Sequence, residues 1–241
     1  MSTALEAQWL TLFRHDDILG HYDVRYYHGV VSYSERTDTL RHMIRAYLQF
    51  FRTEGLETWI AHGTLLGWWW NGKMLPWDWD IDMQVSGATL GYLGTHYNRT
   101  TYHYASSADR STKRHYLLDI NPFSRERIRG DGQNIIDARW IDTHNGLYID
   151  ITGLSEVAPD VSPGIVSCKN YHRYRAGDLW PLRETEYEGE RAWVPNNYVG
   201  VLKEEYGDKA LVGTDFEGHY WDEGKREWVR RLGEGVLDPL E

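Results

Sequence analysis

The chain has 241 residues and a mass of 28.3 kDa, and 41% of its residues are hydrophobic and 14% aromatic, which favours one folded domain with a real core over a disordered chain. Its formal net charge of −10 argues against nucleic-acid binding as the main activity, because proteins that contact a phosphate backbone usually carry a basic face. The single cysteine, Cys168, excludes a disulfide within the chain and a zinc site built from several thiolates.

The N-terminal segment is rich in Tyr, His and Asp and shows no clear periodicity, so we expect residues 1–34 to form an irregular arm over the domain. It lacks the basic start and the apolar run of a signal peptide. No stretch of the chain approaches the roughly 20 apolar residues that span a bilayer. Taken by itself, the sequence therefore predicts a soluble chain without a targeting or transmembrane segment.

A helix should follow the arm and open a domain over residues 35–210. Apolar residues recur from Leu40 to Phe51 at the i, i+3, i+4, i+7 spacing of one helix face, and Gly55 supplies a stop signal. A short strand over residues 58–61 should come next.

Gly63 and Thr64 lie between that strand and an apolar run through Trp70, which predicts a buried helix ended by Asn71-Gly72. Glycine at such a turn lets a phosphate approach the backbone, and the start of a helix presents free N–H donors to an anion. The Thr64 hydroxyl can add a donor. We therefore predict that Gly63 and Thr64 bind substrate, whereas we interpret His62 as a hydrogen-bonded structural residue.

Three aspartates at alternate positions, Asp78, Asp80 and Asp82, form the chemical centre of the sequence. In an extended strand alternate side chains share a face, so Asp80 and Asp82 should project together from backbone positions about 6.6 Å apart, with Ile81 and Met83 packed on the other side. Two carboxylates held in this way can converge on one hard cation. We predict that Asp80 and Asp82 bind a metal and act in catalysis, and that Asp78 contacts substrate or orients the loop.

A third carboxylate from a neighbouring strand would complete such a site, because Mg²⁺ and Mn²⁺ prefer carboxylate oxygens and keep positions open for water and phosphates. Asp150 is flanked by apolar residues, as a side chain emerging from a packed strand into a cleft would be. Asp119 has almost the same setting. We predict Asp150 as the third metal-binding and catalytic residue, with Asp119 as the alternative.

The remaining segments carry weaker patterns. We expect helices over residues 87–97 and 198–206, strands over 116–120, 135–142 and 147–151, and a charged loop over 122–132. Asn145-Gly146 predicts a hairpin between the last two of these strands. Residues 211–241, which are acidic and include Trp221 and Trp228, predict a tail or a packing arm.

Four further side chains are candidates for substrate contact, each with a structural alternative. Lys73 can meet a donor phosphate as a point charge or remain a solvated loop cation. Trp77 can stack on a sugar or a base or simply pack in the protein. Arg173 and Arg175 lie in an aromatic and basic cluster and can fork onto phosphate oxygens, or they can be ordinary surface residues.

Several stretches occur in a fixed order: His62-Gly63-Thr64-Leu65-Leu66-Gly67, Pro76-Trp77-Asp78-Trp79-Asp80-Ile81-Asp82, Ile149-Asp150-Ile151, Tyr187-Glu188-Gly189, Val194-Pro195 and Tyr206-Gly207. Together they resemble the LicD family of the nucleotidyltransferase superfamily, which includes fukutin, fukutin-related protein and fungal mannosylphosphorylation proteins. The likeness covers roughly residues 35–210. Its tryptophan-rich stretches, Trp68-Trp69-Trp70 and Trp77-Asp78-Trp79, are most similar to the fungal branch. Trp79 stands where bacterial members usually have another aspartate.

The resemblance implies a single α/β (α+β) domain with a nucleotidyltransferase-like mixed β-sheet flanked by helices. It implies a transferase that moves a phosphate-linked group, such as mannose phosphate, ribitol phosphate or phosphocholine, from a nucleotide-activated donor to a glycan or glycoprotein. Mannose phosphate is the favoured version. Mg²⁺ or Mn²⁺ held by Asp80, Asp82 and Asp150 would clamp the donor diphosphate.

Two other functions stay open on the sequence alone. One is a catalytically silent family member that regulates or binds glycan for a separate mannosylphosphate transferase, and the other is a sugar-binding module that relies on the tryptophans. The compartment stays open as well, because eukaryotic relatives usually work in the Golgi and secretory pathway behind a membrane anchor, whereas the residues alone predict a soluble chain, with the cytoplasm as the alternative.

Overall fold

The computed structural model describes residues 19–106, 113–129, 132 and 134–231. Its centre is an eight-stranded sheet in which β1, β2, β6, β5, β4 and β3 lie side by side, while β7 pairs with β6 and β8 with β7. The bounds of these strands are β1 (Trp59–Ile60), β2 (Ile81–Ser86), β3 (Thr100–Ala105), β4 (Lys113–Ile120), β5 (Ala138–Asp142), β6 (Tyr148–Glu156), β7 (Ile165–Ser167) and β8 (Arg173–Arg175). The β2–β6 pair is parallel and the other pairs are antiparallel, so the predicted mixed sheet is confirmed.

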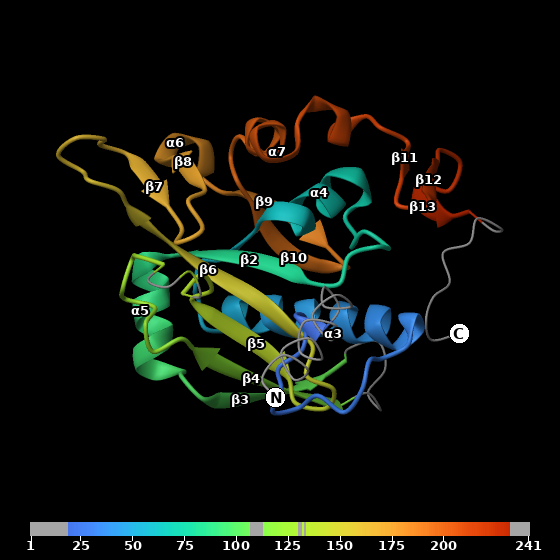
Figure 1. Ribbon diagram of the computed structural model, residues 1–241, viewed down its shortest axis with the longest axis horizontal. Coiled ribbons are helices and arrows are strands. Elements are labelled where there is room, and N and C mark those ends of the chain that lie inside the picture. The colour runs from blue at the N-terminus through green and yellow to red at the C-terminus, as the bar shows by residue number, and fades with distance from the viewer. Residues whose placement is uncertain (1–18, 107–112, 130–131, 133, 232–241) are drawn as a thin grey trace, which may run out of the picture.

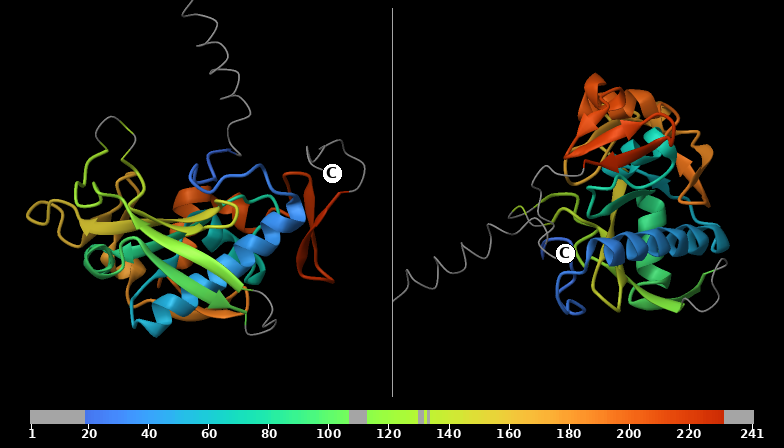
Figure 2. Two further views of the ribbon diagram at one scale, coloured as in Figure 1. Left: turned by 90° about the horizontal axis from the view of Figure 1, so that it is seen from below. Right: turned by 90° about the vertical axis from the view of Figure 1, so that its right-hand side faces the viewer.

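The long helix α3 (Tyr33–Thr53) lies along one face of this sheet (Figures 1 and 2). Ser32 caps its start by accepting a hydrogen bond from the Glu35 amide, and Gly55 follows its end with a φ of +66°. Its predicted apolar face is buried, and the rings of Tyr47 and Phe50 pack against Trp140 of β5. This layer is the main core of the protein.

The other elements cover the edges and ends of the sheet. Figure 1 shows α4 (His62–Asn71), α7 (Tyr198–Tyr206) and the C-terminal strands on one side of β2, opposite α3. Helix α5 (Gly87–His96) directly follows β2. The remaining elements are α6 (Ala176–Leu179), the hairpin β9 (Arg183–Tyr187) and β10 (Glu190–Val194), the short helix η2 (Asp208–Leu211), and a three-stranded sheet of β11 (Asp215–Phe216), β12 (His219–Asp222) and β13 (Glu227–Arg230). None of the helices in the described ranges is long and apolar enough to cross a membrane.

Most of the predicted helices and strands are present in the structure, and the structure also contains strands that were not predicted. The helices expected near residues 34–54, 64–70, 87–97 and 198–206 are confirmed, as are the strands around 58–61, 116–120, 138–142 and 148–151. The strands β3, β7 and β8 and the β9–β10 hairpin were not predicted. The first described residues are irregular apart from a bridge between Tyr22 and Leu147, and the segment expected as a tail or packing arm contains β11–β13. The boundaries of the arm, domain and tail stay a prediction.

The two faces of the central strands differ in chemistry because residues paired across neighbouring strands share a face. The face toward α3 carries Ile81, Met83, Ile149, Ile151, Trp140 and Leu118, all fully or almost fully buried. The opposite face carries charged residues at the alternate positions. This second face is where the predicted site lies.

Candidate active site

Four charged residues form one row across the sheet, each in register with the next. Asp82 on β2 pairs with Asp150 on β6, Asp150 pairs with Arg139 on β5, and Arg139 pairs with Asp119 on β4. Neighbouring strands are about 4.8 Å apart, so Asp150 lies one strand from Asp82, whereas Asp119 lies three strands, or about 14 Å, away. The structure therefore brings Asp150, and not Asp119, alongside Asp82.

The start of α4 holds the acidic loop in place. The Asp82 amide donates a hydrogen bond to Thr64 Oγ1 at 2.9 Å, and the Ala61 amide donates to the Asp82 carbonyl at 3.2 Å. A Cβ at Gly63 would lie 3.0 Å from Asp78 Oδ2, so glycine is required by the close approach of Asp78. His62 opens the helix with a φ of +51°, a left-handed conformation that non-glycine residues seldom adopt. Gly63 and Thr64 thus shape the site through Asp78 and Asp82, and their contact with substrate stays a prediction.

The carboxylates carry unbalanced charge in a buried setting. Burial, followed by the charge of Asp80, raises the pKa of Asp78 to about 8. Burial raises the pKa of Asp82 to about 7, with His62 opposing and Asp80 and Asp150 adding to the effect. Burial also raises the pKa of Asp150 to about 6, although Arg139 works in the opposite direction. Such shifts mean that the folded protein holds these groups in their charged form only at a cost, which a nearby cation would remove.

The side chains of Asp80, Asp82 and Asp150 have the right chemistry for a hard divalent cation, but they are not already arranged around one. Asp80, Asp82 and Asp150 offer the oxygen ligands that Mg²⁺ and Mn²⁺ prefer. Among the residues that the structure describes, however, no group of three or more His, Cys, Asp or Glu side chains is arranged to hold a metal ion as it stands. Asp150 instead accepts a hydrogen bond from Arg139 Nε at 2.9 Å. A cation would have to share or replace that contact.

Trp79, between the first two aspartates, is held on both sides. The guanidinium carbon of Arg36 lies 4.1 Å from its ring centre, and the ring of His21 stacks on it with a centroid distance of 6.4 Å. Arg36 also donates to the Pro76 carbonyl at 2.9 Å, and His21 Nδ1 lies 3.6 Å from Asp80 Oδ2. Trp79 therefore anchors the acidic loop to α3 and to His21 of the arm.

A cleft of about 670 Å³ opens beside Asp82. Its inner wall is a hydrogen-bonded group in which Glu205 of α7 lies 3.0 Å from His62 Nδ1 and accepts from the Tyr174 hydroxyl at 2.8 Å. Burial would raise the pKa of Glu205, but the hydrogen bond and charge of His62, together with the hydrogen bond from Tyr174, outweigh it and the pKa is lowered. His62 Nε2 lies 3.3 Å from the amide nitrogen of Gln84, so both ring nitrogens are engaged, as expected for a structural residue. The sequence analysis singled out neither Glu205 nor Tyr174, because no local motif marks either one.

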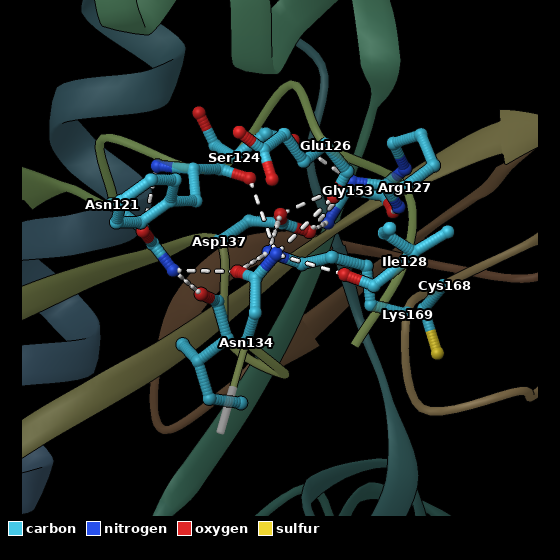
Figure 3. Close-up of polar contacts among 12 residues, drawn as sticks. Asn121, Ser124, Glu126, Arg127, Ile128, Asn134, Asp137, Gly153, Cys168 and Lys169 are labelled. Atoms are coloured by element: carbon cyan, nitrogen blue, oxygen red, sulfur yellow. Dashed lines mark hydrogen bonds and ion pairs between the residues drawn. The ribbon is translucent and has the colours of Figure 1, made fainter. Parts of the chain in front are cut away.

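A buried ionic cluster holds the loops next to the cleft residues Ile136 and Asn170 (Figure 3). Lys169 and Asp137 have fully buried side chains and lie 2.9 Å apart, and Arg127 reaches both Asp137 oxygens at 3.1 and 3.2 Å. Lys169 also donates to Asn134 at 2.5 Å. These contacts tie together the loops that carry the cleft residues Ile135, Ile136, Asn170, Tyr171 and His172.

Cys168, next to this cluster, has a partner that the sequence analysis did not foresee. Its sulfur lies 3.4 Å from His172 Nδ1. Burial nevertheless raises the pKa of the thiol, so the contact does not create a reactive thiolate.

The four further candidates lie in different places. Arg173 lines the cleft, whereas Arg175 is exposed at the other end of β8. Lys73 pairs with Glu227 of β13 at 2.6 Å. The ring of Trp77 packs against the C-terminal sheet, with centroid distances of 5.3, 5.3 and 5.0 Å to Phe216, His219 and Trp228. For Lys73 and Trp77 the structure thus offers structural partners, and their contact with substrate stays a prediction.

Residues 55–197 match the family described as LicD/FKTN/FKRP, nucleotidyltransferase domain. The chain is similar to mannosyltransferase regulator 4 of Saccharomyces cerevisiae, with 36% identity over 141 residues, and to mannosyltransferase regulator 14 of the same yeast, with 39% identity over 116 residues. These matches cover 57% and 48% of this chain but only 12% of each yeast protein. The matched residues span β1 to β10 and include the three aspartates and Asp150, and the chain belongs to the LicD family.

Proposed function

We propose that the chain is a divalent-metal-dependent transferase that moves a phosphate-linked group from a nucleotide-activated donor to a glycan. The observation that carries the proposal is the pairing of Asp82 with Asp150, two largely buried carboxylates with raised pKa values, where Asp82 lines the cleft of about 670 Å³. Carboxyl pKa values that are raised by burial and by neighbouring carboxylates are typical of metal and catalytic sites. The yeast relatives, named as mannosyltransferase regulators, favour mannose phosphate among the possible groups.

Asp80, Asp82 and Asp150 would hold Mg²⁺ or Mn²⁺ in this proposal. A bound divalent ion would supply charge neutralisation for the donor diphosphate and its leaving group. The protein supplies the rest through position: Thr64 fixes the backbone of Asp82, and Arg36 and His21 fix the loop that carries Asp80. The cleft beside Asp82 is large enough for one sugar nucleotide or for part of a glycan.

The transfer itself is a substitution at phosphorus. An acceptor sugar hydroxyl oxygen forms a bond to the donor phosphorus, and the bond from that phosphorus to the nucleotide's leaving oxygen breaks. The hydroxyl proton passes to a carboxylate of the aspartate group, and the nucleotide leaves as its monophosphate. Positioning and charge neutralisation supply most of the rate, and this site is built for both.

A donor screen tests the proposal. Purified protein with Mn²⁺ would be incubated with mannose, ribitol and choline nucleotide donors and with a mannose-rich glycan, and released nucleoside monophosphate would be measured. We expect release that requires metal and acceptor, and at least a hundredfold loss in the Asp82→Asn variant. Asp160→Asn, an exposed loop substitution, is the matched control. Acceptor-dependent release that persists in Asp82→Asn would contradict the assignment.

A second function is favoured by two specific observations. The yeast relatives are named regulators, and Arg139 occupies Asp150 in the structure. A family member that positions or activates a separate mannosylphosphate transferase would show no turnover with any donor. It would raise the rate of that transferase when added to it, and the Asp82→Asn variant would do so equally well.

A further inference from the structure

Arg139 stands at the centre of the charged row. Its Nε donates to Asp150 Oδ1 at 2.9 Å, and its guanidinium carbon lies 3.8 Å from the ring centre of Tyr148. The side chain is 37% exposed. Asp150 contacts the Nε edge of the guanidinium, and the Tyr148 ring covers one of its faces. Together the two contacts fix the plane of the guanidinium. The two outer nitrogens lie on the edge away from Asp150.

The outer nitrogens of Arg139 are available for a ligand. Within the described part of the chain, Nε is the one nitrogen of Arg139 with a hydrogen-bond partner. Arg139 lines a second cavity of about 300 Å³, together with Asp119, Asn121 and Ile136. Ile136 also lines the 670 Å³ cleft. The two cavities therefore adjoin along the row, with Asp82 on one side and Arg139 on the other.

Arg25 in the same cavity shows the contrasting arrangement. It donates to both oxygens of Asp23, at 2.9 and 2.8 Å, and to Asp119 at 2.6 Å. Two carboxylates thus neutralise Arg25, and Arg25 in turn neutralises Asp119, the register partner of Arg139. Among the described residues, Arg139 forms an ion pair only with Asp150, which the proposed function assigns to a metal ion, although the charge of Arg139 also lowers the pKa of Asp23.

We propose that Arg139 binds a phosphate oxygen of the anionic substrate through its two outer nitrogens, in the cavity that adjoins the acidic cleft. The inference rests on the proposed function, because a divalent cation held by Asp150 would weaken the contact of that carboxylate with the guanidinium. A guanidinium presents paired N–H donors that match phosphate geometry. The same side chain therefore balances Asp150 in the free protein and the substrate phosphate in the loaded one.

Inorganic pyrophosphate is a suitable probe because it carries the diphosphate without assuming a donor. Its binding would be measured by calorimetry at saturating Mn²⁺ for wild type, Arg139→Gln and Arg139→Lys, and Mn²⁺ alone would be titrated into each protein. We expect Arg139→Gln to weaken pyrophosphate binding at least tenfold and Arg139→Lys to weaken it severalfold, because lysine keeps the charge and loses the fork. Mn²⁺ affinity should be unchanged or higher in Arg139→Gln, since Asp150 is released.

Arg191→Gln is the matched control, because Arg191 is an exposed arginine that pairs with Glu184 on the β9–β10 hairpin. It should bind pyrophosphate like wild type. Thermal unfolding of each variant shows whether it is folded, and Arg139→Lys keeps the test decisive if Arg139→Gln does not fold.

The possible failures are distinguishable. Pyrophosphate binding that is lost in Asp82→Asn but unchanged in both Arg139 variants would overturn the role of Arg139 and leave the proposed function standing. Binding that is lost in Arg139→Gln, with Mn²⁺ affinity unaffected by Asp82→Asn, would support Arg139 and overturn the metal site. A wild-type protein that binds no pyrophosphate would overturn the inference outright.

Discussion

Asp82 on β2 and Asp150 on β6 are register partners across the parallel pair of strands, and their side chains emerge on the sheet face opposite α3. The two residues are 68 positions apart in the sequence. Their pairing converts a local acidic motif into a two-strand carboxylate site. The same pairing places Arg139 beside them, so that one row carries both the acidic group and a cation.

Replacement of the predicted metal ligands Asp80, Asp82 and Asp150 should weaken metal binding strongly. Calorimetric titration of Mn²⁺ should show at least a hundredfold loss of affinity in the double variant Asp80→Asn/Asp82→Asn and at least a tenfold loss in Asp150→Asn, because each variant removes charged oxygen ligands. Asp119→Asn should bind like wild type, since Asp119 lies about 14 Å away along the row. An Asp119 variant as defective as the Asp150 variant would contradict the choice of third ligand.

The acidic site should make metal-free stability fall as pH rises. Burial raises the pKa of Asp150 to about 6 from an ordinary value of 3.8, so the folded state binds this proton more tightly than the unfolded chain. The resulting penalty is absent below about pH 4, grows through pH 6 and is complete by pH 7, and it amounts to about 3 kcal/mol at most. Urea unfolding of wild type and Asp150→Asn at pH 4.5, 5.5 and 7 would measure it.

Bound Mn²⁺ should counteract the loss of stability that the metal-free protein shows as pH rises. At pH 7 it should raise the unfolding midpoint of the wild type, and it should have little effect at pH 4.5, where Asp82 and Asp150, with pKa values of about 7 and about 6, are protonated. If the difference in stability between wild type and Asp150→Asn does not change with pH, the carboxyl group is not perturbed as described.

Gly63→Ala tests the contact between α4 and the acidic loop. The added Cβ would lie 3.0 Å from Asp78 Oδ2, so the Asp78 side chain must move, and Mn²⁺ affinity should fall severalfold. Gly91→Ala in α5 is the control, because a Cβ there meets nothing within 4 Å and should stabilise the helix by up to about 1 kcal/mol. Equal metal affinity in the two variants would show that the close approach has no role in the site.

Lys169→Met should destabilise the protein strongly. The substitution removes the buried cation beside Asp137, so the expected loss is about 3 kcal/mol. Arg127 and the Gly153 amide still reach Asp137, and Asn121 still donates to Asn134. Lys203→Met removes an exposed pair with Asp208 and should change stability by less than about 0.5 kcal/mol. Chemical denaturation compares the two. Similar losses would mean that the buried cluster contributes no more than a surface pair.

Much of the layout around the site could be predicted because its signals are local. The periodic apolar face of α3 and the alternation along β2 each report which side of one element is buried. The strands β7 and β8 have three residues each, too few for a periodic pattern, and most residues of the β9–β10 hairpin are exposed or half-buried. Glu205 escaped notice for a similar reason, because its role depends on where α7 packs and not on its neighbours in the chain.

The sequence by itself determined that Asp78, Asp80 and Asp82 form an acidic motif and that an aspartate on a later strand could join it. It could not choose between Asp150 and Asp119, because both are flanked by apolar strand residues. Strand order and register made that choice by placing β6 next to β2 and β4 two strands further on. Only the tertiary structure could do so, because hydrogen bonds between backbones distant in the sequence set the register, and the register decides which charges meet.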